Sequence, residues 1–86
     1  MRVVKIFMSD SCPRCPQAKQ LGALLVQKGF LVQLHDVDTA NGLAEAALHG
    51  IHATPSVIVV DMESESVTRG WRGTVPDEDE VIDALE

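Results

Sequence analysis

The hydrophobic positions of this chain form two kinds of pattern, short apolar runs and apolar residues at helical spacing. Residues 3–8 and 56–60 are short apolar runs rich in β-branched side chains, which are typical of buried strands. Residues 30–37 predict a further strand between them. After a turn at residues 61–64, the chain returns in an expected strand at residues 65–69. The pattern therefore predicts four strands.

Three other segments predict helices. The first follows two prolines and ends at a Lys-Gly pair (residues 28–29), a common stop signal for a helix. The second is short, ends at Gly50 and can be capped by Thr39 or Asn41. The third opens at residues 74–77, which resemble a capping box with Asp in place of Glu or Gln.

The elements follow one another in the order βαβαββα, which indicates an α/β fold. The first βαβ unit requires a parallel strand pair with a right-handed crossover, and the short connection at residues 61–64 makes the last two strands antiparallel. We expect a mixed four-stranded sheet with helices on both faces. No linker, repeat or low-complexity segment interrupts the chain, so we expect residues 1–86 to form a single domain.

Composition limits the core and the classes of partner. The chain is 45% apolar but only 3% aromatic, so its core must be aliphatic. The net charge is −6, the acids crowded into residues 77–86 fit a solvated helix face, and no basic patch suggests a nucleic-acid partner. No run reaches the roughly 20 apolar residues of a membrane span, and the first residues lack the pattern of a signal peptide. We therefore expect a cytoplasmic protein with no membrane partner.

Cys12 and Cys15 are the only cysteines, and they lie between the first expected strand and the first expected helix. At positions i and i+3 of a helical turn their Cβ atoms would be about 5–6 Å apart, whereas a disulfide requires about 3.5–4.5 Å. Such a pair closes with strain, and strained, accessible disulfides are labile or catalytic. Because structural disulfides are uncommon in the cytosol, this CxxC sequence indicates redox chemistry.

The surroundings of Cys12 favour its thiolate, the reactive form of a cysteine. A helix start stabilises negative charge, and Arg14 adds a positive charge two residues away. Pro13 fits the first helical position. Pro16, however, lacks the N–H that would bond to the Cys12 carbonyl, so either the first turn is irregular or Pro16 marks the true helix start. Cys15 lies one turn deeper and should be shielded, so we expect Cys12 to attack and Cys15 to resolve the mixed disulfide.

This element order, with CxxC after the first strand and Thr54-Pro55 just before the third, resembles the thioredoxin fold in its minimal, glutaredoxin-like size. Residues 12–15 are similar to the CPxC of glutaredoxins, and Thr54-Pro55 is similar to the cis-proline element of the superfamily. The resemblance implies a thiol–disulfide oxidoreductase that reduces protein or small-molecule disulfides without a cofactor. It also implies that the Pro55 turn lies against the disulfide, where Thr54 offers its backbone to a substrate strand.

A weaker similarity concerns the end of the chain. Gly70-Trp71-Arg72 resembles the tail of small redoxins that donate electrons to ribonucleotide reductase. In a glycine-rich loop after the last strand, these three residues would contact a substrate, although Trp71 could instead cover one end of the small core.

The electron donor is also inferred from the resemblance. Glutaredoxins that bind glutathione carry a Lys three residues before the first Cys, and a Gly-Gly followed by acidic residues at the last helix. This chain has Ser9 at the first position and Gly-Trp-Arg-Gly-Thr at residues 70–74. We therefore expect a thioredoxin-reductase-type donor ahead of glutathione, and disulfide-containing proteins as clients.

Two alternatives remain open, a soft-metal carrier and a redox-inactive interaction domain. Copper chaperones also place CxxC after a first strand, but they carry Met two residues before the first Cys, where this chain has Asp10. Their element order is βαββαβ. His49 and His52 are closer together than zinc-finger ligands, so no structural metal site is expected.

Overall fold

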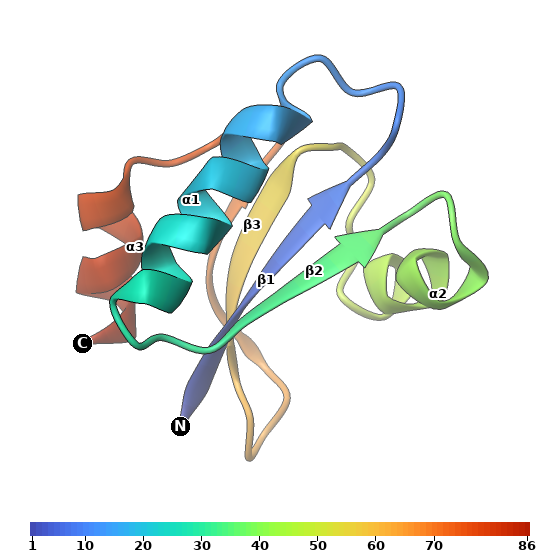
Figure 1. Ribbon diagram of the computed structural model, residues 1–86. Coiled ribbons are helices and arrows are strands. Elements are labelled where there is room, and N and C mark those ends of the chain that lie inside the picture. Colours follow the sequence, from blue (N-terminus) through green and yellow to red (C-terminus); the bar gives the residue numbers. More distant parts are fainter.

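A four-stranded mixed sheet forms the centre of the computed structural model, which describes residues 1–86 (Figure 1). The elements are, in chain order, β1 (Arg2–Met8), α1 (Cys15–Gln27), β2 (Val32–Asp36), α2 (Ala40–Leu48), β3 (Ser56–Asp61), β4 (Val67–Arg72) and α3 (Glu78–Leu85). The strand order is β2-β1-β3-β4, with β1 parallel to β2, and β3 antiparallel to both β1 and β4. The predicted order βαβαββα is confirmed, and the arrangement is a minimal thioredoxin fold.

Helices cover both faces of the sheet. α1 and α3 lie on one face and α2 on the other (Figure 1). The central strand β1 supplies side chains to both layers: Val4 and Ile6 pack toward α1, whereas Val3 and Phe7 pack toward α2. None of the four is more than 3% exposed, as expected for a strand buried on both faces. In addition, no helix has the length and apolar character needed to cross a membrane.

The first helix begins after the first cysteine. α1 starts at Cys15, with Arg14 at the N-cap and Pro16 in the first turn. The Cys15 N–H donates to the Cys12 carbonyl at 3.3 Å, which closes a turn before the helix. The expectation that Cys12 lies at the helix start is therefore wrong. Pro16 explains the difference, because it cannot donate the hydrogen bond that a helix beginning at Cys12 would need.

Side-chain caps set the starts of the other two helices. Thr39 caps α2, its Oγ1 accepting from the Gly42 N–H at 3.0 Å. The N-cap of α3 is Asp77, and the Glu80 carboxylate accepts from the Asp77 N–H at 3.0 Å. The capping box predicted at residues 74–77 is therefore wrong, because the acceptor lies three residues after Asp77 and not three residues after Thr74.

The connection between β3 and β4 is longer than the sequence suggests. The Asp61 carboxylate accepts from the Glu63 N–H at 2.9 Å, and such backbone hydrogen bonds hold the pKa of this carboxyl below its ordinary value. Glu65 has a φ of 58°, so the turn is still in progress there. β4 consequently starts at Val67. Trp71, expected in a loop, lies within β4 instead.

Candidate active site

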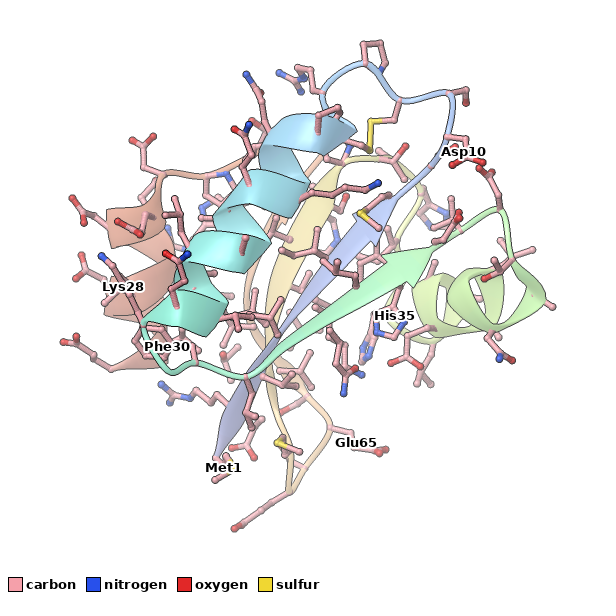
Figure 2. All side chains as sticks on the ribbon, in the orientation of Figure 1. Met1, Asp10, Lys28, Phe30, His35 and Glu65 are labelled. Atoms are coloured by element: carbon pink, nitrogen blue, oxygen red, sulfur yellow. A yellow bond between two sulfur atoms is a disulfide. The ribbon has the colours of Figure 1, made fainter.

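Cys12 lies in the connection between β1 and α1 (residues 9–14, the cysteine turn), and Cys15 is the first residue of α1. They form a disulfide with Cα atoms 5.4 Å apart, and Figure 2 shows it at the edge of the sheet where Asp10 lies. Cys15, in the first turn of α1, is only 2% exposed. Cys12 is half-buried, and the two residues between them, Pro13 and Arg14, are exposed. An incoming molecule therefore reaches Cys12 more readily than Cys15.

The segment that leads to Cys12 is held by a carboxylate from the turn after the neighbouring strand β2. Ser9 Oγ donates to the Asp38 carboxylate at 3.1 Å, and the Asp10 N–H donates to it at 2.9 Å. The Cys12 N–H in turn donates to the Ser9 carbonyl at 3.3 Å. Asp38 was not among the expected site residues. The signal was available, because parallel strands such as β1 and β2 end at the same edge of a sheet.

Arg14 joins the cysteine turn to the segment between β4 and α3. Its guanidinium donates to the Gly73 carbonyl at 2.5 Å. Gly73 has a φ of +76°, a conformation that glycine adopts without strain. The expected positive charge of Arg14 is therefore present in the cysteine turn, but the Arg14 Nη2 atom is hydrogen-bonded to the Gly73 carbonyl.

The segment before β3 lies next to the cysteine turn. The Thr54-Pro55 peptide bond is cis; Pro55 is buried and Thr54 half-buried. A pocket of about 190 Å³ separates this segment from the residues before Cys12, and it is lined by Ser9, Val37, Ala46, Ile51, His52, Ala53 and Thr54. The fold thus brings Ser9, three residues before Cys12, to the same pocket as residues 51–54, which are far from it in the chain.

The three residues expected at the end of the chain do not form one surface. Trp71 pairs with Val57 and packs against the core under α1 and α3. Arg72 points toward the opposite face, where its guanidinium donates to the His49 carbonyl at 3.4 Å. Gly70 lies between β4 neighbours and opposite Ile58. A role of Gly70, Trp71 and Arg72 in substrate binding stays a prediction.

Ionisable side chains under α2 form a separate cluster. Lys5 donates to the Glu45 carboxylate, which holds the pKa of that carboxyl below its ordinary value. The buried His49 ring places Nε2 3.2 Å from the Lys5 ammonium. Burial lowers the pKa of His35, whose ring stacks on Phe7 with centroids 5.2 Å apart. These contacts fix α2 on the sheet.

Three carboxylates lie near the cysteine turn. Asp10, Asp36 and Asp38 place oxygens within 4.8 Å of one another. Asp36 accepts from the Asp38 N–H at 2.8 Å, and Asp38 accepts from Ser9 and Asp10. Asp38 thus orders the segment before Cys12, and Asp36 holds the backbone of Asp38.

Comparison with known proteins agrees with this geometry. Residues 2–86 match the family model described as a thioredoxin domain. A probable thioredoxin of Archaeoglobus fulgidus is 36% identical over 62 residues, which cover 71% of this chain and 68% of that protein. A mutant thioredoxin of Halobacterium salinarum superposes with a TM-score of 0.79 at 22% identity, over 95% of this chain and 69% of that one. Thioredoxin f2, in a complex with ferredoxin:thioredoxin reductase, superposes with a TM-score of 0.72 at 16% identity, over 98% and 74%. The chain therefore belongs to the thioredoxin superfamily, with its redox-active cysteine pair at Cys12 and Cys15.

Proposed function

We propose that this protein reduces disulfide bonds of client proteins or small thiol compounds, with Cys12 as the nucleophile and Cys15 as the resolving thiol. The observation that carries the proposal is the difference in burial within a pair that can form a disulfide. Cys15 is 2% exposed, whereas Cys12 is half-buried in a turn whose other residues are exposed.

The electrons are transferred in two exchanges. The Cys12 thiolate attacks one sulfur of the client disulfide, forming a mixed disulfide and releasing the first client thiol. The Cys15 thiolate then attacks the Cys12 sulfur, which releases the second client thiol and forms the Cys12–Cys15 disulfide. Two electrons and two protons have passed to the client, and a separate reductant must return them to the protein.

The neighbouring residues support these steps in different ways. Arg14 places a permanent positive charge in the cysteine turn, which favours the Cys12 thiolate. Pro13 restricts the turn between the two sulfurs. Thr54, beside the pocket that includes Ser9, offers its backbone to an extended client segment, and Pro55 removes a competing backbone N–H at that point.

Partners and location follow from the same proposal. We infer clients that carry disulfides, a thioredoxin-reductase-type electron donor and a cytoplasmic location. The structural similarity to thioredoxin f2, a protein solved with its reductase, supports a reductase donor. No cofactor or metal takes part in the two exchanges as written.

Two variants test the roles of Cys12 as nucleophile and Cys15 as resolving thiol. Cys12→Ser should lose insulin disulfide reduction, because the nucleophile is gone. Cys15→Ser should instead trap a mixed disulfide through Cys12, visible by mass spectrometry and released by dithiothreitol. Ser11→Ala changes an exposed neighbour of the same turn and should keep activity. Loss of function without a trapped adduct in Cys15→Ser, or an adduct formed through Cys15 in Cys12→Ser, would contradict the assigned roles.

A further inference from the structure

Ser56 is a fully buried polar residue in a strand that is otherwise aliphatic up to its last position. It opens β3, whose sequence is Ser-Val-Ile-Val-Val-Asp, and it is 0% exposed. Its Oγ donates to the Ala53 carbonyl at 2.6 Å and accepts from the Gly73 N–H at 3.2 Å. Neither partner belongs to β3. The hydroxyl therefore bonds to the two segments that flank the site.

These bonds continue to the cysteine turn. Gly73, whose N–H is held by Ser56, accepts a hydrogen bond from Arg14 at 2.5 Å through its carbonyl. One chain of hydrogen bonds thus runs from Arg14, between the cysteines, through Gly73 and Ser56, to Ala53. Ala53 directly precedes Thr54, whose backbone is the proposed partner of a client strand.

We propose that Ser56 is a positioning residue for client binding, whose hydroxyl holds the Ala53–Thr54 backbone in register with the cysteine turn. This inference rests on the proposed function and adds to it a residue that determines how a peptide-like client is seated. Ser56 itself touches neither the sulfurs nor the client.

The physical cost of a serine at this position supports the inference. A hydroxyl buried without hydrogen bonds is destabilising, and serine fits the interior of a strand less well than valine does. The hydroxyl is therefore favourable only because of its bonds to Ala53 and Gly73. Without it, the Ala53 carbonyl and the Gly73 N–H would each lose a partner at a part-buried position, and the backbone next to Thr54 would be free to shift.

Two kinds of substrate should depend on Ser56 to different degrees. An extended protein client has to pair with the Thr54 backbone, so its reaction depends on the position of that segment. A small aromatic disulfide needs only access to the Cys12 sulfur. Loss of the Ser56 hydroxyl should therefore slow the reaction with a protein disulfide and leave the reaction with a small disulfide nearly unchanged.

The test compares Ser56→Thr with Ser56→Val. Threonine and valine have nearly the same shape, and valine carries a methyl group where threonine has its hydroxyl. The difference in rate between the two variants therefore isolates the hydrogen bonds. The pre-reduced proteins react in single turnovers with insulin and with 5,5′-dithiobis(2-nitrobenzoate). We expect Ser56→Val to react with insulin about tenfold more slowly than Ser56→Thr, the size of effect that one lost hydrogen bond produces. The small disulfide and the pH profile of Cys12 alkylation should differ by less than about twofold.

The control is Thr68→Val on β4. This substitution removes a hydroxyl that donates to the Val59 carbonyl of β3 at 3.3 Å and lies outside this chain of bonds. It should leave both reactions unchanged. Equal insulin rates for Ser56→Thr and Ser56→Val would overturn the proposal. Equal slowing of both substrates by Ser56→Val would also overturn it, because the hydroxyl would then act on the thiols.

A second measurement does not depend on a variant that folds. In the wild-type protein the Gly73 amide proton should exchange with solvent slowly, because it is bonded to a buried oxygen, and rapid exchange would overturn the proposal. Ser56→Ala, the smaller substitution, should speed that exchange. If the wild-type protein reduced neither insulin nor the aromatic disulfide, the proposed function itself would fail, whereas the amide measurement would still report on the Ser56 bond.

Discussion

The two cysteines differ most in how far they are covered. Cys15 is 2% exposed in the first turn of α1, and Cys12 is half-buried in the turn before it. In the reduced protein, iodoacetamide should therefore alkylate Cys12 at least about tenfold faster than Cys15, because a reagent must reach the thiolate to react with it. Peptide mass spectrometry after short exposures measures both rates. Faster modification of Cys15 would reverse the proposed order of attack.

Single residues of the site differ in how well the sequence predicts them. Cys12 and Cys15 are visible because the two residues that act together are neighbours in the chain. Ser56 is not visible, because its partners are backbone groups, and Gly73 lies 17 positions away in the chain. Asp38 lies 28 positions from Asp10, and only the expected parallel pairing of the first two strands could have placed it near the site. Only the fold brings such groups within hydrogen-bond distance.

At the scale of elements, the contact between α2 and β2 leaves no room for a side chain at Gly42. A Cβ atom added there would overlap the Asp36 carbonyl. Gly42→Ala should therefore lower the free energy of unfolding by more than about 2 kcal/mol, although alanine normally favours a helix over glycine.

Urea denaturation of Gly42→Ala beside Gly22→Ala measures this effect. Gly22 is also a buried helical glycine, but its added Cβ would meet the flexible end of Ile6 at 3.1 Å. That variant should lose less than about 1.5 kcal/mol. Equal losses for the two variants would show that backbone overlap at Gly42 is not the cause.

The packing of α2 on the sheet should also depend on pH. Lys5 holds the pKa of Glu45 below its ordinary value of 4.5, so the pair stabilises the fold above that pH and is lost as the pH falls through the lowered pKa. Glu45→Gln should reduce the unfolding free energy by about 1 kcal/mol at pH 7. The difference from the parent protein should narrow below about pH 4.5.

Unfolding of Glu45→Gln by urea between pH 3 and pH 7 checks this. Glu63→Gln, an exposed carboxylate in the turn after β3, serves as the control and should be nearly neutral throughout. If the free energies of unfolding of Glu45→Gln and the parent protein differed by the same amount at every pH, the charge of Glu45 would not be what holds α2.

The order and type of all seven elements could be predicted, because apolar periodicity and stop signals such as Gly50 report burial and chain reversal directly. The starts of helices were harder. α1 begins at Cys15 because Pro16 lacks an N–H, and α3 begins after Asp77 because Glu80 can reach back to it. Trp71 was expected in a loop because the sequence pattern places the last strand at residues 65–69. The turn after β3 still includes Glu65, so β4 begins at Val67 and contains Trp71.

At the scale of the whole molecule, the net charge of −6 includes three acids beside the cysteine turn, and these matter for the electron donor. Asp10, Asp36 and Asp38 lie beside the cysteine turn. Glutathione carries two carboxylates, so these three carboxylates repel it.

The two arginines expected at the site are already engaged. The Arg14 guanidinium donates to the Gly73 carbonyl, and the Arg72 guanidinium donates to the His49 carbonyl on the α2 face. The position three residues before Cys12, where glutathione-binding glutaredoxins carry a Lys, is Ser9, which donates to Asp38. A protein donor does not need such anchors, because it binds over a larger surface.

We therefore expect a flavin-dependent thioredoxin reductase to reduce the Cys12–Cys15 disulfide better than glutathione does. Each missing charged anchor costs about 1.5–3 kcal/mol, so glutathione should bind tenfold or more weakly for each. NADPH consumption, coupled either to a thioredoxin reductase or to glutathione with its reductase, compares the two donors on the same protein. Ser9→Lys is the matched variant: it restores one cation at the position the glutathione-binding proteins use, and should raise the rate with glutathione alone. Efficient turnover of the unaltered protein by glutathione, with none by thioredoxin reductase, would show that the three carboxylates beside the cysteine turn and the engaged arginines do not decide the donor.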